Sequence, residues 1–132
     1  MAHEDGAAYY PLVATVSLGA PIVLDIHAKN ERERVGTRAG PRVPEFRIIQ
    51  EPRSLLITTQ DLYNDFLHGI AECRADEELN SETICNWHML GDTQLYSRSG
   101  RYERQTRISL TYRDVQKVAK VGNSVKFLTA GR

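Results

Sequence analysis

The sequence has little of several features that would fix the class of a protein at once. Its 132 residues include only two cysteines, Cys73 and Cys85. Two cysteines neither require nor support a disulfide framework, so we expect reduced thiols. The longest apolar runs, residues 12–18 and 22–26, are far shorter than the roughly 20 residues of a transmembrane helix. Residues 1–5 also lack the basic and apolar regions of a secretion signal. We therefore expect a soluble intracellular protein without a membrane partner.

Charge of one sign is not in excess either, because 17 basic and 17 acidic residues give a formal net charge of zero. The charges are nevertheless segregated along the chain. Residues 29–53 and 98–132 are predominantly basic, whereas residues 61–82 are predominantly acidic. A basic loop at residues 29–44 either contacts a polyanion such as DNA or RNA or pairs with its own glutamates.

A hydrophobic content of 41% with 26% charged residues is ordinary for one globular domain with one core, and we expect residues 1–132 to belong to a single domain. Alternating and β-branched residues predict strands at residues 12–18, 22–27, 46–49 and 54–57, in the manner of a β meander. A short helix is expected to start at Thr59, with Leu62, Phe66 and Leu67 as its apolar stripe. Residues 74–104 are polar and aperiodic, which predicts a surface insertion.

The first candidate site is His3-Glu4-Asp5, because side chains at alternate positions of an extended backbone project from one side. An imidazole and a carboxylate so placed can meet at one cation, and a third ligand would complete the 2-His-1-carboxylate arrangement of Fe(II) oxygenases. The alternative is a solvated turn near a chain end.

Two further groups of possible ligands are weaker. Asp25 and His27 form a second such pair, or else a polar strand face. Cys85 and His88, with Cys73 before them, suggest zinc but do not supply four ligands at paired spacing.

A second candidate site lies on the strand predicted at residues 107–113. Alternation places Ile108, Leu110 and Tyr112 on one face, and the other face carries polar residues: Arg107, Ser109, Thr111 and Arg113. Six residues of strand span roughly 20 Å, so two arginines reaching inward would leave a gap of a few ångströms that a short dicarboxylate fills. The alternative is a half-exposed strand with a charged outer face.

In combination, these motifs resemble the AlkB-type Fe(II)/2-oxoglutarate dioxygenases. The resemblance is carried by the order of His3-Glu4-Asp5, then His68-Gly69-Ile70, then Arg107-x5-Arg113. It is sharpened by the stretches His3 to Gly19 and Glu51 to Ile70, which look like the sixth AlkB homologue of eukaryotes. It covers most of residues 1–72 and 105–128 and fails at 29–44 and 74–104.

The resemblance implies a mainly β fold, a double-stranded β-helix or jelly roll with one short helix. It implies Fe(II) bound by His3, Asp5 and His68. It also implies that Arg107 grips the distal carboxylate of 2-oxoglutarate while Arg113, helped by Ser109, serves the end nearest the metal. The implied reaction consumes 2-oxoglutarate and dioxygen and demethylates an N-alkylated base of DNA or RNA, in the cytoplasm and nucleus. Tyr9 and Tyr10 either stack on a base or cap the barrel.

One departure from the family bears on activity. The family carries early barrel strands, an Asn-x-Tyr stretch that contacts 2-oxoglutarate and a substrate-gripping lid before its His-x-Asp motif. This sequence begins two residues before His3, so we expect an N-terminally truncated form with open sheet edges and exposed apolar surface. The alternative function is therefore a catalytically inactive fragment, or a module that binds nucleic acid or protein.

Overall fold

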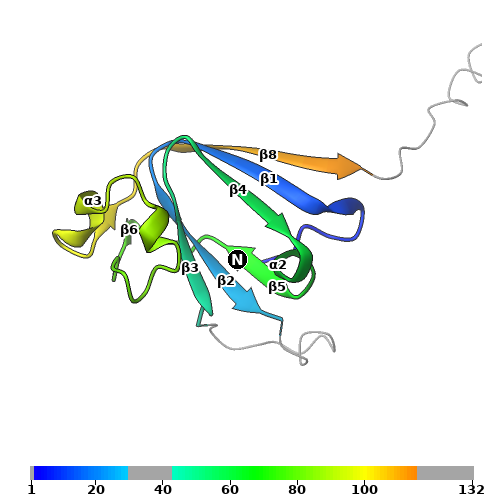
Figure 1. The fold of residues 1–132 in the computed structure, drawn as a ribbon, viewed down its shortest axis with the longest axis horizontal. Coiled ribbons are helices and arrows are strands. Elements are labelled where there is room, and N and C mark those ends of the chain that lie inside the picture. Colours follow the sequence, from blue (N-terminus) through cyan, green and yellow to red (C-terminus); the bar gives the residue numbers. More distant parts are fainter. Residues whose placement is uncertain (1, 30–42, 116–132) are drawn as a thin grey trace, which may run out of the picture.

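The computed structural model describes residues 2–29 and 43–115, and its main strands form two antiparallel sheets of three strands each (Figure 1). The first sheet has the order β4 (Ser54–Thr59), β1 (Tyr9–Gly19) and β8 (Arg107–Val115). The second sheet has the order β3 (Phe46–Gln50), β2 (Ile22–Ala28) and β5 (Phe66–Gly69). A short ribbon joins β6 (Ala75–Asp76) to β7 (Tyr102–Glu103).

The chain crosses repeatedly between the two sheets. The chain leaves the first sheet after β1, forms β2 and β3 in the second, and returns to the first with β4. The expected meander is therefore wrong, while the mainly β architecture is that of a jelly-roll core. The crossing after β1 depends on Gly19, because its φ is +80° and an added Cβ would lie 2.6 Å from the carbonyl oxygen of Thr106.

The five strands predicted from alternation are all present, within a few residues of their expected ends. The helix is shorter than predicted: α2 covers only Gln60–Asn64. Phe66 and Leu67 do not continue a helical stripe, because β5 begins at Phe66 and pairs with β2, with Ile26 opposite His68. A free strand edge on β2 offers these residues a full set of backbone hydrogen bonds, which an isolated turn of helix does not.

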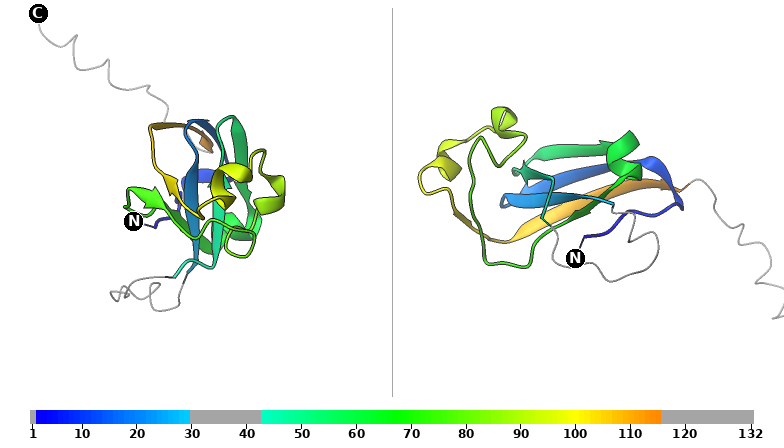
Figure 2. Two further views of the ribbon diagram at one scale, coloured as in Figure 1. Left: turned by 90° about the vertical axis from the view of Figure 1, so that its left-hand side faces the viewer. Right: turned by 90° about the horizontal axis from the view of Figure 1, so that it is seen from below.

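Residues 74–104 form a folded lobe at one end of the molecule (Figures 1 and 2). The lobe contains the 3-10 helix η1 (Trp87–Met89) and the helix α3 (Gln94–Ser97), which was not expected. Its Leu79, Ile84 and Tyr96 are each only 1% exposed, and they pack against Val23 of β2 and Ile49 of β3. The prediction of a purely surface insertion is therefore wrong, since the lobe covers one face of the second sheet and completes the core.

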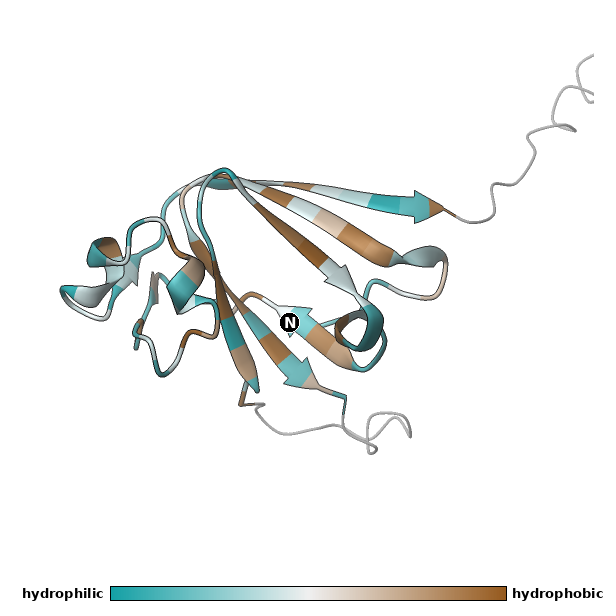
Figure 3. Ribbon diagram, in the orientation of Figure 1, coloured by the Kyte–Doolittle hydropathy of each residue, from teal (hydrophilic) through white to brown (hydrophobic). Residues whose placement is uncertain are grey.

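Apolar and polar residues are mixed along the strands of the first sheet (Figure 3). The face of this sheet that is turned away from the second sheet is its outer face. Exposed apolar side chains of the outer face come from both edge strands: Leu55, Ile57, Ile108, Leu110 and Tyr112. Neighbouring strands bring them into rows, as Leu55 and Leu110 both lie opposite Val16 of β1. None of the helices in residues 2–29 and 43–115 has the length and apolar character needed to cross a membrane. Most of the basic loop predicted at 29–44 lies outside the described residues.

Candidate metal and carboxylate site

The inner face of the first sheet borders a cavity of about 370 Å³ between the two sheets. The second sheet contributes Leu24, Gln50, His68 and Gly69 to its wall. All six site residues predicted from the sequence line this cavity: His3, Asp5, His68, Arg107, Ser109 and Arg113. Residues separated by more than 100 positions are thus gathered around one space.

His3 and His68 are brought together by the backbone. The amide of each donates to the carbonyl of the other, both at 2.9 Å, which adds His3 to the free edge of β5. The centroids of the two imidazole rings lie 4.6 Å apart. A residue near the chain end is therefore held by paired backbone hydrogen bonds next to its mid-chain partner.

Asp5 lies beside both His68 and Arg113. Its side chain is only 4% exposed. The oxygen Oδ1 accepts a hydrogen bond from Nε of Arg113 at 2.7 Å, and NH2 of the same arginine lies 2.5 Å from this oxygen. The other oxygen, Oδ2, lies 3.7 Å from Nε2 of His68. Arg113 thus compensates the charge of the buried carboxylate and leaves Oδ2 on the side of the imidazole.

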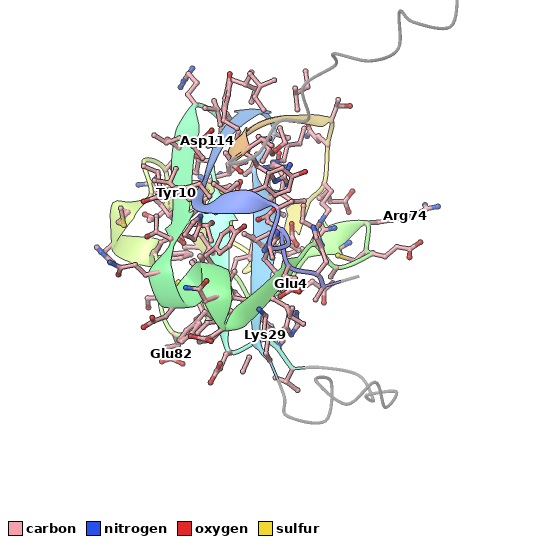
Figure 4. The ribbon with its side chains drawn as sticks, turned by 90° about the vertical axis from the view of Figure 1, so that its right-hand side faces the viewer. Glu4, Tyr10, Lys29, Arg74, Glu82 and Asp114 are labelled. Carbon is pink, nitrogen blue, oxygen red and sulfur yellow. The ribbon has the colours of Figure 1, made fainter. Side chains whose placement is uncertain are left out.

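Two further contacts hold the segment that carries His3 and Asp5. Lys29, the residue after β2, pairs with Glu4, with its Nζ 2.5 Å from Oε2 (Figure 4). The hydroxyl of Tyr63 in α2 donates to the carbonyl of Gly6 at 2.8 Å. These contacts lie on either side of Asp5 in the sequence and fix its backbone over the cavity.

The three predicted metal ligands are chemically suited to a divalent metal. Burial lowers the pKa of His68, against the opposing effect of Asp5, which favours the neutral form of the imidazole. Neutral imidazoles and a carboxylate are the ligands of Fe(II) oxygenase sites. As the side chains stand, however, no group of three or more His, Cys, Asp or Glu in residues 2–29 and 43–115 forms a ready metal-binding cluster.

Arg107 lies deeper in the cavity and is held differently from Arg113. Its Nε donates to Oγ of Ser17 on β1, and its NH2 donates to Oε1 of Gln50 on β3, both at 2.7 Å. Burial lowers the pKa of Arg107 from its ordinary value, although an arginine remains charged at neutral pH. A desolvated cation with neutral partners favours an anionic ligand, because a carboxylate would restore the lost solvation.

The predicted polar face of β8 is confirmed, since Arg107, Ser109, Thr111 and Arg113 all line the cavity. The two arginines do not face each other across an empty gap, because Arg113 is bound to Asp5. Arg113 also lies over Tyr9, with its guanidinium carbon 5.5 Å from the ring centroid.

The other candidate ligands lie away from this cavity. Of the strand β2, Leu24 faces the cavity, and Asp25 on the opposite face lies 3.6 Å from Nε of Arg47. Cys73 and Cys85 are exposed free thiols. None of these candidate ligands is among the residues that line the cavity.

Sequence reasoning missed four residues that hold the site, namely Ser17, Gln50, Lys29 and Tyr63. Ser17 lies two residues after Thr15 and four after Val13 on β1, so strand alternation alone could have placed its side chain on the cavity side. Nothing local marks Gln50, Lys29 or Tyr63, because their roles arise from strand pairing and from contacts between distant segments.

Comparison with known proteins finds a similar sequence. A protein of Danio rerio named "Probable RNA/DNA demethylase ALKBH6" is 33% identical over 132 residues, in a match that covers 91% of this chain and 49% of that protein. The chain therefore spans about half the length of the curated relative that it matches. No protein-family model matches the sequence.

Proposed function

The chain is an AlkB-type relative, and from this premise we propose that it is an Fe(II)- and 2-oxoglutarate-dependent dioxygenase that demethylates N-alkylated nucleic acid. One observation carries the proposal: two imidazoles and a buried carboxylate share a cavity with a desolvated guanidinium that has neutral partners. A metal that takes nitrogen and oxygen ligands and a co-substrate that bears carboxylates together match these two halves of the cavity.

The metal half of the proposal assigns His3, Asp5 and His68 as ligands. Iron bound there would supply the oxidising chemistry that consumes 2-oxoglutarate and dioxygen. The protein's own contribution is to keep His68 neutral by burial and to orient Asp5 through Arg113. Hydrogen bonds of this kind to a ligating carboxylate commonly affect metal affinity by roughly 10- to 100-fold.

The co-substrate half assigns Arg107 to the distal carboxylate of 2-oxoglutarate. Arg107 and Asp5 lie on the same cavity, so a molecule with one carboxylate on Arg107 can extend toward the metal ligands. Ser109 lines the cavity between Arg107 and Arg113 along β8 and offers a hydroxyl to the same ligand. We assign Arg113 to the metal end, where it already binds Asp5.

The substrate class is supported by the printed name of the relative, which is that of a probable RNA/DNA demethylase. An aromatic ring at the metal end is compatible with a nucleobase, and Tyr9 on β1 lies against Arg113 there. Tyr10 follows it in the chain and is half-exposed (Figure 4). Base stacking on such side chains is the usual means of holding an unpaired base.

The test measures succinate released from 2-oxoglutarate in the presence of Fe(II), dioxygen and a methylated oligonucleotide. His68→Ala should abolish iron binding and turnover, and Arg107→Ala should weaken 2-oxoglutarate binding. The matched controls are His88→Ala and Arg98→Ala. They remove an imidazole and a guanidinium from exposed positions of the lobe and should leave turnover unchanged. A chelator should remove the activity, and added Fe(II) should restore it.

Equal turnover in the wild type and in both site variants would disprove the proposal. If the wild type releases no succinate and binds neither Fe(II) nor 2-oxoglutarate, the alternative of an inactive fragment or a binding module stands. Nucleic-acid affinity that falls with salt and ignores iron and 2-oxoglutarate would then identify the binding module.

A further inference from the structure

Arg107 differs from the other arginines that are partly buried near the two sheets. Arg47 pairs with Asp25, Arg104 with Asp76 and Arg113 with Asp5. Both hydrogen-bond acceptors recorded for Arg107 are neutral, the hydroxyl of Ser17 and the amide oxygen of Gln50. Among residues 2–29 and 43–115, Arg107 is therefore the cavity arginine that has no carboxylate partner.

Gln50 is the less expected of these two acceptors. It is the last residue of β3, it is only 4% exposed, and it lies opposite Ile22 of β2 in the sheet. Burying an amide side chain costs free energy unless its hydrogen bonds are satisfied. Because a guanidinium group can only donate, the amide must present its oxygen to Arg107. The assignment of the two amide atoms is thus fixed by chemistry.

We infer that Gln50 is a positioning residue, which holds the guanidinium of Arg107 in the cavity without neutralising it and so keeps it available to a carboxylate ligand. This inference deepens the proposed function and rests on it. A glutamate of the same size would hold Arg107 equally well, but it would satisfy the charge from within the protein.

The geometry gives the reason why both acceptors are needed. Ser17 is fully buried on β1, and Gln50 belongs to the opposite sheet, so Arg107 is fixed from both walls of the cavity. Their bonds use two of the five N–H donors of the guanidinium. The remaining donors form the fork that a carboxylate can engage in a bidentate manner.

The inference distinguishes a positioning role from a purely structural role. If Gln50 serves only packing, any change that weakens ligand binding should also weaken the fold. If Gln50 keeps Arg107 available, Gln50→Glu should raise thermal stability, because it pairs a desolvated cation, while it weakens carboxylate binding. Opposite changes in the two quantities are the signature of the positioning role.

The experiment measures the melting temperature and, by calorimetry, the affinity for 2-oxoglutarate and for glutarate, in the full chain with and without Mn(II). Gln50→Glu should lower both affinities by roughly 10- to 100-fold, as expected for the loss of charge-assisted hydrogen bonds, and raise the melting temperature. Gln50→Met, which keeps the length of the side chain but accepts no comparable hydrogen bond, should lower affinity less and also lower the melting temperature.

The matched control is Gln94→Glu, the same change at an exposed position of α3 in the lobe. It should leave affinity and melting temperature as in the wild type. The inference is overturned if Gln50→Glu binds both carboxylates like the wild type, or if the wild type binds neither. Glutarate binding that is sensitive to Gln50→Glu, together with no 2-oxoglutarate turnover, would uphold the inference and reject the proposed function.

Discussion

The cavity wall and the lobe at residues 74–104 differ in regularity of backbone and in polarity of side chains. The wall belongs mainly to regular strands, and beside apolar residues such as Val13 and Leu56 it carries polar residues: Thr15, Ser17, Arg107, Ser109 and Thr111. The lobe at residues 74–104 is polar and irregular in sequence, yet it supplies Leu79, Ile84 and Tyr96 to the core cluster. The proposed ligand site lies between the sheets, and the outer side of the second sheet provides much of the apolar packing.

This difference separates the residues that stabilise the fold from those that bind. The hydroxyl and charged groups of the cavity gain little from burial, so much of the stability must come from apolar contacts. The lobe provides it through apolar contacts and through Glu51, which accepts hydrogen bonds from the amide of Gly91 at 2.7 Å and the hydroxyl of Tyr96 at 3.2 Å. Substitutions in the two regions should therefore have different consequences.

The largest loss of stability is expected in the lobe. Ile84→Ala should lower the free energy of unfolding by about 2–5 kcal/mol, the usual cost of removing a large buried aliphatic side chain. Urea denaturation monitored by circular dichroism measures this change. Leu95→Ala is the control, because Leu95 in the same lobe is 46% exposed and should cost much less. Equal losses in the two variants would show that the lobe is not part of the core.

A smaller effect on stability, but a marked one on the site, is expected from Gly69→Ala at the end of β5. An added Cβ would lie 2.9 Å from Cα of Ala2, so the segment that carries His3 and Asp5 must move away. We expect loss of the paired hydrogen bonds between His3 and His68, about 1–2 kcal/mol in total, and weaker binding of Fe(II) or Mn(II).

Amide hydrogen exchange at His3 and His68 measures the change in pairing, and metal titration measures the change in affinity. Gly91→Ala serves as the control in the lobe, since its added Cβ would meet Oε2 of Glu51 at an ordinary 3.5 Å. Unchanged protection of the two histidine amides in Gly69→Ala would show that their pairing does not depend on close approach at Gly69.

The smallest expected effect is a dependence of stability on alkaline pH that originates in the lobe. Burial, reinforced by Glu51, raises the pKa of Tyr96 above its ordinary value of 10.0. The unfolded chain therefore releases this proton first as the pH rises above 10, and the free energy of unfolding falls. Tyr96→Phe should cost about 1 kcal/mol near neutral pH, the value of one hydrogen bond.

The difference between the wild type and Tyr96→Phe should then shrink above pH 10, because phenylalanine has no proton to lose. Urea denaturation at pH 7 to 11 measures it, with the neutral points as the internal reference. A difference that stays constant with pH would mean that Tyr96 does not carry the alkaline dependence.

Much of the strand content could be predicted because local alternation marks it. The period of two at residues 107–113 placed Arg107, Ser109, Thr111 and Arg113 on one face, and the structure puts that face in the cavity. The helix stripe through Phe66 failed because short apolar segments are ambiguous in period. The edge of β2, which lies about 40 residues earlier in the chain, decided in favour of a strand.

The chain by itself determined its strand-forming segments, the chemical types of the candidate ligands and their order, since these depend on neighbours within a few residues. Tertiary structure alone decided that His3 pairs with His68 and that Arg113 binds Asp5. It also decided that Ser17 and Gln50 hold Arg107 from opposite walls of the cavity. The physical reason is that hydrogen bonds and burial between distant segments are set by sheet register and by crossings between sheets, which no local pattern encodes.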